Sequence, residues 1–184
     1  MKLRAVTPDD AAAVAAIYAD YVTESIVTFE LEPPSAHEMR GRMEAVAGRY
    51  PWIVAEAEDG GLAGYAYACP FRPRLAYRFA VETSVYLRAD AAGRGLGSSL
   101  YRPLLATLEG QGYTQAIAAI ALPNEASVRL HERLGFVAAG TYAKVGYKLE
   151  RWVDVGLWQR PLAAAGTPPP NPQPLGPNFS FEAP

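Results

Sequence analysis

The stretch Ser84–Gly97, SVYLRADAAGRGLG, carries an alternating strand pattern directly into a glycine-rich loop. The residues that follow, 98–111, place leucines at helical spacing, so the loop joins a strand to a helix. Backbone N–H groups and the positive end of the dipole at such a helix N-terminus attract an anion, typically a pyrophosphate. The loop therefore predicts either a phosphate cradle or a plain strand-to-helix turn that favours glycine.

Three nucleotide-binding hypotheses compete for this loop. A P-loop would end in Gly-Lys-Ser/Thr, but Gly97 is followed by Ser98 and Ser99. A dinucleotide-binding fingerprint would need glycine at position 98 and an acidic residue near position 115, where this chain has Ser98 and Gln115. The remaining hypothesis is a cradle for the pyrophosphate of coenzyme A, formed by Gly93–Gly97.

Outward from the loop, periodicity predicts the element order β-α-α-β-β-β-α-β-α-β-β, which is typical of a mixed α/β sheet. Ser35 and Glu38 form a capping box that opens the second helix. The expected strands span 3–6, 52–58, 62–68, 80–88, 113–122, 136–142 and 147–158, and the expected helices span 8–24, 35–49, 98–111 and 124–134.

The composition limits the classes of protein to which this chain can belong. The chain has 184 residues, half of them hydrophobic, which is enough to bury a core. Seventeen basic against nineteen acidic residues give a net charge of −2 without any charged block, which argues against nucleic-acid or membrane partners. One cysteine, Cys69, and an N-terminus without an apolar stretch predict a soluble, cytoplasmic protein.

The C-terminal composition differs from the rest. Seven of the 16 prolines fall in residues 163–184, where Glu182 is the single charged residue. Such a segment cannot pack a core, so we expect a domain at 1–162 and an extended or disordered tail at 163–184. Its aromatic end, Asn178-Phe-Ser-Phe181, could dock on a surface.

Two motifs resemble the GNAT N-acetyltransferase superfamily. Ala92–Gly97 matches its Q/R-x-x-G-x-G/A signature, and Ala119–Phe136 looks like its second motif. One departure is Ala92, where the signature has glutamine or arginine; it removes one side-chain contact but leaves the backbone cradle.

More narrowly, the chain resembles phosphinothricin N-acetyltransferases in short sequence motifs that are spread from about residue 6 to residue 160. These are Thr28-Phe-Glu, Glu32-Pro-Pro, Tyr50-Pro-Trp-Ile-Val-Ala-Glu, Gly64-Tyr-Ala-Tyr-Ala, Val81-Glu-Thr-Ser-Val-Tyr, Leu122-Pro-Asn, Leu130-His-Glu and Val153-Asp-Val-Gly. The resemblance implies a mostly antiparallel sheet flanked by helices, with acetyl-CoA wedged between two strands that splay apart after Glu82. It also implies cofactor contacts at Val85, Tyr86, Leu87, Gly93, Arg94, Gly95, Leu96, Gly97, Ser98 and Asn124.

Glu82 and His131 are the catalytic candidates. Glu82 opens the alternating strand, and a half-buried carboxylate can take a proton from an ammonium group, often through water. The residues alone favour a solvated glutamate, whereas the family's general base matches this position. His131 occupies the place where many GNAT enzymes have a tyrosine that protonates the departing thiolate. A structural hydrogen bond is the alternative role for this histidine.

The acceptor candidates come from two loops. Arg72 and Arg74 are closely spaced guanidinium groups, which suit a carboxylate or phosphinate, although a solvated basic loop is an equal possibility. By resemblance, Arg72, Arg74 and Tyr77 join Thr28, Phe29 and Glu30 around the amino-acid substrate, and Cys69 has no role.

The resulting expectation is a homodimeric, metal-free N-acetyltransferase. It would move acetyl from acetyl-CoA to the α-amine of a small amino acid by direct attack, since no serine or cysteine nucleophile lies in an activating pattern. The implied substrates resemble phosphinothricin, methionine sulfone or methionine sulfoximine. Two alternatives stay open: an enzyme that acts on a peptide or protein N-terminus, and a non-catalytic CoA-binding regulatory module.

Overall fold

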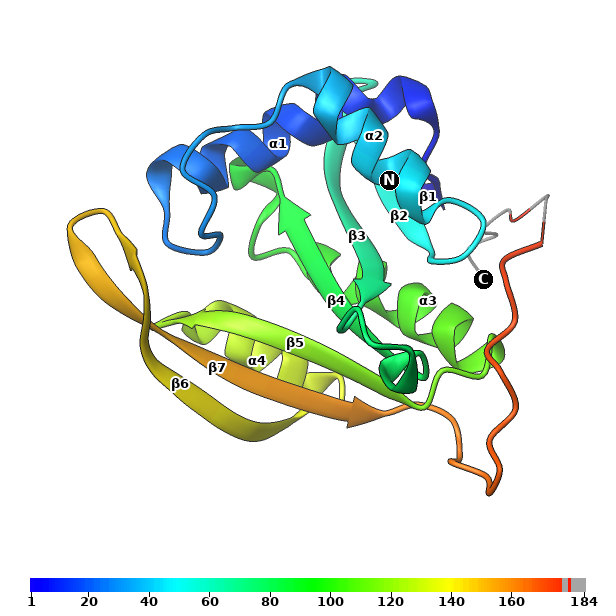
Figure 1. Cartoon of the computed structure of the whole chain (residues 1–184). Coiled ribbons are helices and arrows are strands. Elements are labelled where there is room, and N and C mark those ends of the chain that lie inside the picture. Colours follow the sequence, from blue (N-terminus) through cyan, green and yellow to red (C-terminus); the bar gives the residue numbers. More distant parts are fainter. Residues whose placement is uncertain (177–178, 180–184) are drawn as a thin grey trace.

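A seven-stranded sheet forms the centre of the computed structural model, which describes residues 1–176 and residue 179 (Figure 1). Most of the expected docking segment 178–181 lies outside these residues. The strands are β1 (Lys2–Ala5), β2 (Trp52–Glu56), β3 (Leu62–Pro70), β4 (Ala80–Leu87), β5 (Gln115–Leu122), β6 (Val137–Lys148) and β7 (Arg151–Pro161). The α-helices are α1 (Ala11–Glu24), α2 (Ala36–Val46), α3 (Leu96–Gly110) and α4 (Glu125–Arg133), with 3-10 turns η1 (Pro8–Asp10), η2 (Leu75–Tyr77) and η3 (Ala89–Ala91).

The expected element order and the mostly antiparallel sheet are confirmed. The strand order is β1-β2-β3-β4-β5-β7-β6, and β4 with β5 forms the parallel pair among antiparallel neighbours. These two strands pair only through Ala80–Glu82 of β4 and Gln115–Ile117 of β5. Beyond Glu82 they separate, so the sheet opens at its centre (Figure 1).

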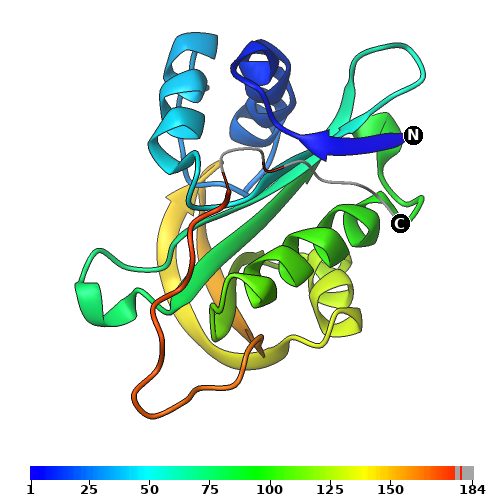
Figure 2. The same ribbon diagram turned by 90° about the vertical axis from the view of Figure 1, so that its right-hand side faces the viewer.

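Helices cover both faces of the sheet (Figure 2). Helices α1 and α2 pack on one face, in a core that contains Val14, Trp52 and Tyr65. Helices α3 and α4 cover the other face, where Leu100 and Leu104 pack in the larger core. Side chains alternate between the two faces along a strand. The side chain of Val81 therefore lies on the α3 face of β4, and that of Glu82 lies on the α1/α2 face.

The last hairpin corrects the sequence prediction. Strand β6 continues to Lys148, and the turn lies at Leu149 and Glu150, whose φ angles are 49° and 58°. The expected turn before Tyr147 is instead a bulge that shifts the register between Tyr142 and Gly146. Gly146 ends this bulge, and a Cβ there would overlap the ring of Phe29.

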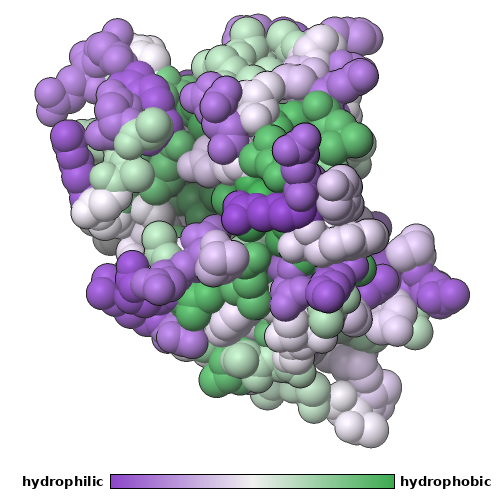
Figure 3. Space-filling view, turned by 90° about the vertical axis from the view of Figure 1, so that its left-hand side faces the viewer, coloured by the Kyte–Doolittle hydropathy of each residue, from purple (hydrophilic) through white to green (hydrophobic). Residues whose placement is uncertain are grey.

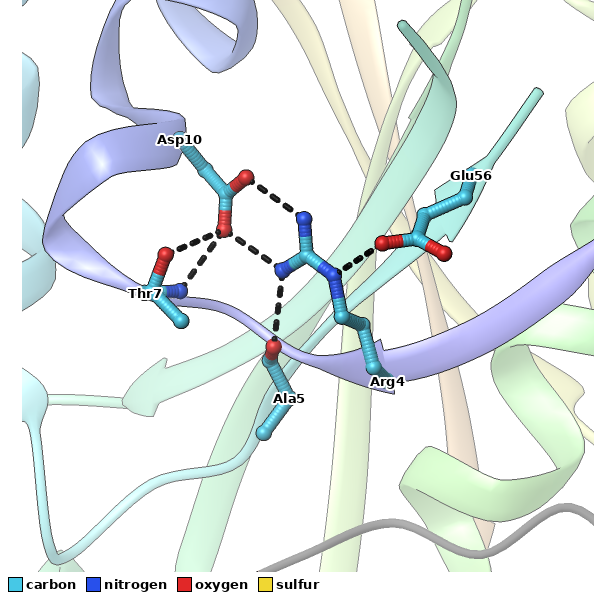
Figure 4. Close-up of polar contacts among 5 residues, drawn as sticks. All are labelled: Arg4, Ala5, Thr7, Asp10 and Glu56. Atoms are coloured by element: carbon cyan, nitrogen blue, oxygen red, sulfur yellow. Dashed lines mark hydrogen bonds and ion pairs between the residues drawn. The ribbon is translucent and has the colours of Figure 1, made fainter. Parts of the chain in front are cut away.

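A half-buried ion pair joins β1 to the start of α1 (Figure 4). The Arg4 guanidinium donates to both Asp10 oxygens at 2.7 and 2.8 Å and to Glu56 at 2.6 Å. Burial alone would raise the pKa of Asp10, but the hydrogen bonds from Arg4 and Thr7 outweigh it and lower the pKa. The carboxylate therefore stays charged and anchors the first helix.

The tail follows the domain surface as far as it is described. Gln173 N–H donates to the Gln111 carbonyl at 2.7 Å, and Gln111 Nε2 donates back to the Gln173 carbonyl at 2.9 Å. Arg78 Nε donates to Asn171 Oδ1 at 2.8 Å. The division into a domain at 1–162 and a tail at 163–184 stays a prediction.

Candidate active site

The glycine loop places an uncapped helix end next to the opening in the sheet. Gly93 and Gly95 adopt φ angles of 78° and 83°, which favour glycine, and α3 begins at Leu96 rather than at Ser98. The first N–H groups of α3 have no intrahelical acceptors, and its N-cap Gly95 has no side chain to supply one. The loop therefore presents backbone donors to an anion. The side chain of Leu96 is buried, so its contribution would be its backbone.

Gly97 serves packing as well as the loop. A Cβ at this position would come within 3.0 Å of Leu130 Cδ2 on α4. The missing side chain lets α3 and α4 approach closely behind the opened strands. Arg94 is exposed on the loop, and Ser98 stands half-buried in the first turn of α3.

A cavity lies where β4 and β5 separate. It is lined by Val27, by the β4 segment 83–86, by the β5 segment 118–121, and by Asn124, Ser127, Tyr101 and His131. Seen from the side on which the strands part, the surface is hollowed, and hydrophobic side chains lie within the hollow (Figure 3). Asn124 caps α4 as expected, since its Oδ1 accepts from Ser127 N–H at 3.1 Å.

Among Val85, Tyr86 and Leu87 of β4, the backbone N–H of Val85 faces away from β3 and has no hydrogen bond to a side chain of the described residues. Arg88 N–H bonds to Ala63 of β3, so the N–H groups of Tyr86 and Arg88 face β3, and those of Val85 and Leu87 face the other way. Leu87 N–H already donates to the Tyr21 hydroxyl at 3.1 Å, and that hydroxyl donates back to the Leu87 carbonyl. Val85 is the residue left to polarise a carbonyl group in the cavity.

Glu82 stands at the last paired position before the strands part. It lies opposite Cys69 in the β3–β4 register and is half-buried. Burial raises the pKa of Glu82, and the positive charge of Arg72 opposes the shift. A carboxylate with a raised pKa is a stronger proton acceptor than an exposed one. The Cys69 thiol is unreactive because burial raises its pKa to about 12.

His131 is buried, with both ring nitrogens in hydrogen bonds. Nδ1 lies 2.8 Å from the Ser127 carbonyl, which can only accept, so Nδ1 carries the proton. Nε2 lies 2.9 Å from the Tyr101 hydroxyl, and that hydroxyl lies 3.4 Å from Thr83 Oγ1. Burial lowers the pKa of His131 despite the Ser127 hydrogen bond. The neutral imidazole thus accepts from Tyr101 at the wall of the cavity.

This burial makes stability depend on pH. The pKa of His131 lies lower in the fold than its ordinary value of 6.5, so protons favour the unfolded chain and stability falls as pH drops through that value. We expect the loss of Tm between pH 7.5 and pH 5.5 to be smaller in His131→Gln than in the parent. Thermal unfolding measures it, and the exposed His37, replaced by glutamine, is the control. An unchanged loss of Tm in His131→Gln would contradict the assignment.

The loop after α1 holds three acceptor candidates, each fixed by its own partner. The Thr28 hydroxyl lies 2.5 Å from the Tyr18 hydroxyl. The ring of Phe29 packs over Gly146. Glu30 does not point a free carboxylate at a substrate: Arg42 donates to its two oxygens at 2.6 and 2.8 Å.

Two further residues that the sequence analysis missed hold this loop in place. Arg42 lies on α2, and the buried Lys148 on β6 donates from Nζ to the Thr28 carbonyl at 2.7 Å. Neither pairing left a local signal, because Arg42 is 12 positions from Glu30 and Lys148 is 120 positions from Thr28.

The second group of candidates lies at the other end of β4. Arg72, Arg74 and Tyr77 are exposed on the loop around η2, near the start of β4, whereas Thr28–Glu30 lie toward its end (Figures 1 and 2). Tyr77 contacts Phe71 edge to face, and the Arg72 guanidinium lies over the same Phe71 ring. Of the three, Arg72 acts electrostatically on Glu82. Within the described residues, no hydrogen bond or ion pair joins the two groups, and their joint role around a substrate stays a prediction.

Known proteins share sequence similarity with this chain over most of its length. The model of the acetyltransferase (GNAT) domain family matches residues 3–157. The chain belongs to the GNAT acetyltransferase family. It is 45% identical over 170 residues to a phosphinothricin N-acetyltransferase of Streptomyces viridochromogenes, covering 92% of each chain. It is also 36% identical over 151 residues to an L-methionine sulfoximine/L-methionine sulfone acetyltransferase of Pseudomonas paraeruginosa, covering 82% of this chain and 88% of that one.

A solved GNAT structure shows the same fold. The phosphinothricin acetyltransferase of Sinorhizobium meliloti, in complex with acetyl-CoA, superposes with a TM-score of 0.87 at 37% identity, over 99% of this chain and 98% of that one. The opened strands and the uncapped α3 end of the present chain fit acetyl-CoA as co-substrate. Within the part of the chain that the structure describes, no helix is long and apolar enough to cross a membrane.

Proposed function

We propose that this chain transfers the acetyl group of acetyl-CoA to the α-amine of a small amino acid of the phosphinothricin, methionine sulfone or methionine sulfoximine type. The observation that carries the proposal is Glu82: a half-buried carboxylate with a raised pKa, at the last residue pair before the sheet opens. The names of the relatives support an amino-acid acceptor. The single thiol, Cys69, agrees with a reducing compartment, the cytoplasm.

The candidate active-site residues take separate roles in the proposed mechanism. The backbone donors of α3 and its glycine loop bind the pyrophosphate, and Val85 N–H polarises the thioester carbonyl. Glu82 takes the proton of the ammonium group, through water, so that the neutral amine attacks directly. The Tyr101 hydroxyl, held by His131 Nε2 in the same cavity, is proposed to give its proton to the departing sulfur and to regain one from solvent.

A screen of free amino acids for CoA release tests the function. We expect turnover with amino acids of the stated type and little or none with the same compounds lacking the carboxylate. Turnover of a peptide N-terminus in preference to free amino acids would favour the alternative enzyme. An absence of CoA release with every amine would favour a binding module.

We also propose a homodimer. Large apolar side chains stand exposed along the β6–β7 hairpin, where Tyr147 and Trp152 are 58% and 61% exposed and contact each other. An exposed patch of this kind marks an interaction surface.

The mass of the protein in solution tests the proposed dimer directly. Sedimentation should give about twice the chain mass of 19.8 kDa for the parent, and a smaller value for Trp152→Glu. A monomeric parent at micromolar concentration would contradict the proposal.

A further inference from the structure

The tail contacts the domain at two neighbouring places, where it passes between the end of α3 and the η2 turn (Figure 2). Asn171 Oδ1 accepts a hydrogen bond at 2.8 Å from Nε of Arg78, the residue that follows η2. The Gln173 N–H donates to the Gln111 carbonyl at 2.7 Å, and Gln111 Nε2 donates to the Gln173 carbonyl at 2.9 Å. The tail thus joins the end of α3 to the η2 turn.

Gln111 gives the tail a firm anchor. It is only 7% exposed, and its Nε2 also donates to the Arg49 carbonyl at 2.9 Å. One buried side chain therefore holds together the segment after α2, the end of α3 and the tail. Because Gln173 is fixed on Gln111, Asn171 is held two positions away, beside Arg78.

The sequence around Asn171 favours a docked, extended segment. Prolines occupy positions 168–170, 172 and 174. Each proline ring fixes its own φ angle, and the residue before a proline is restricted as well. The segment therefore loses less conformational entropy on docking than a flexible tail would lose.

A short series of contacts leads from Arg78 to Arg72. Arg78 Nη1 and the Arg78 backbone N–H both donate to the Leu75 carbonyl, at 3.3 and 3.0 Å, and so close the η2 turn. Tyr77 of this turn contacts the Phe71 ring edge to face, and the Arg72 guanidinium lies over the same ring, 5.2 Å from its centroid. A displacement of the turn would therefore displace the Arg72 side chain.

Arg72 gains from such support because it is exposed. A free arginine side chain gives up rotamer freedom when it binds a carboxylate, and a side chain that is held beforehand gives up less. The positive charge of Arg72 acts on Glu82, so the held guanidinium lies near the proposed general base.

We propose that Asn171 is a positioning residue for the acceptor: the docked tail holds the η2 turn through Arg78 and so keeps Arg72 in place for the carboxylate of the amino acid. The proposal rests on the proposed function above, which supplies that carboxylate. Neither Asn171 nor Arg78 needs to touch the acceptor. Binding of acetyl-CoA should not depend on the tail, because the proposed cradle lies at the opposite end of α3 from Gln111.

The first test removes the hydrogen bond to the tail. Asn171→Ala should raise KM for methionine sulfone by about 3- to 10-fold, the size of one hydrogen bond. The values of kcat, KM for acetyl-CoA and Tm should stay near those of the parent, since Asn171 is exposed. Thr167→Ala, at another exposed position of the tail, is the control and should change none of these quantities.

The second test asks whether the tail acts through the Arg72 guanidinium. In the Arg72→Met background, Asn171→Ala should have little further effect on KM, because the group that the tail positions is already missing. Arg78→Met should raise KM in the same direction, and adding Asn171→Ala to it should change little. The decarboxylated acceptor should be used equally by the parent and by Asn171→Ala.

The outcomes separate the two proposals. A parent that acetylates no amino acid overturns the proposed function itself. If the parent does acetylate methionine sulfone, the role of the tail is overturned by an unchanged KM in Asn171→Ala, or by an increase that adds in full to that of Arg72→Met. A loss of Tm or kcat in place of the rise in KM would assign Asn171 a structural role only, and would overturn the proposal as well.

Discussion

Replacing Glu82 by glutamine should lower kcat/KM by about 10²-fold or more, because the amide keeps the shape of the side chain but cannot accept the proton of the ammonium group. Glu82 lies at the last residue pair before β4 and β5 part, and burial raises its pKa. The affinity for acetyl-CoA should hardly change, since the cradle consists of backbone donors from the α3 N-terminus.

Steady-state kinetics and calorimetric titration with acetyl-CoA measure the two quantities separately. Glu32→Gln, at an exposed acidic position beyond the loop of Thr28–Glu30, is the control and should keep parental turnover. The activity of the parent should fall at acid pH, as Glu82 becomes protonated, along a limb above the usual glutamate range. Near-parental turnover in Glu82→Gln at neutral pH would contradict the assignment of Glu82 as the general base.

The fold could be predicted because its signals are local. The capping box of Ser35 and Glu38 forms as expected, and the glycines at 93 and 95 adopt the conformations that the loop motif requires. The change from a helical period to an alternating one located β2 through β4 to within two residues at either end. The prediction failed at the last hairpin: the expected break between residues 142 and 147 is a bulge within β6, and the turn uses Leu149 and Glu150, which are not typical turn residues.

The candidate site was predictable only in part, because its remaining features depend on long-range register. Trp52 faces Tyr67 only once β2 pairs with β3, and Cys69 faces Glu82 only once β3 pairs with β4. The cavity that Trp52, Tyr67 and Cys69 line leaves no pattern along the chain. The same holds for the bond from Lys148 to Thr28, which joins residues 120 positions apart. Resemblance to a family supplied the identities of Glu82 and His131, and the structure supplied their burial and partners.

Replacing Arg72 by methionine should raise KM for the amino-acid acceptor by about 10- to 150-fold, because a charge-assisted hydrogen bond to a carboxylate contributes roughly 1.5–3 kcal/mol. The exposed Arg72 lies near Glu82, whose pKa it lowers. KM for acetyl-CoA should stay unchanged. Arg74→Met should act in the same direction, because Arg74 belongs to the same exposed loop.

Arg72→Met has a second effect, which distinguishes a local role from general damage. Loss of the positive charge removes the influence that lowers the pKa of Glu82, so the acid limb of kcat/KM should move to higher pH. Arg133→Met, an exposed position at the end of α4, should change neither KM nor the limb. The decarboxylated acceptor should be a poor substrate for the parent and lose little further in Arg72→Met, since the group that Arg72 binds is already missing. If the parent acetylates that amine as readily as the amino acid, Arg72 has no carboxylate to bind, and a peptide or polyamine acceptor becomes the better hypothesis.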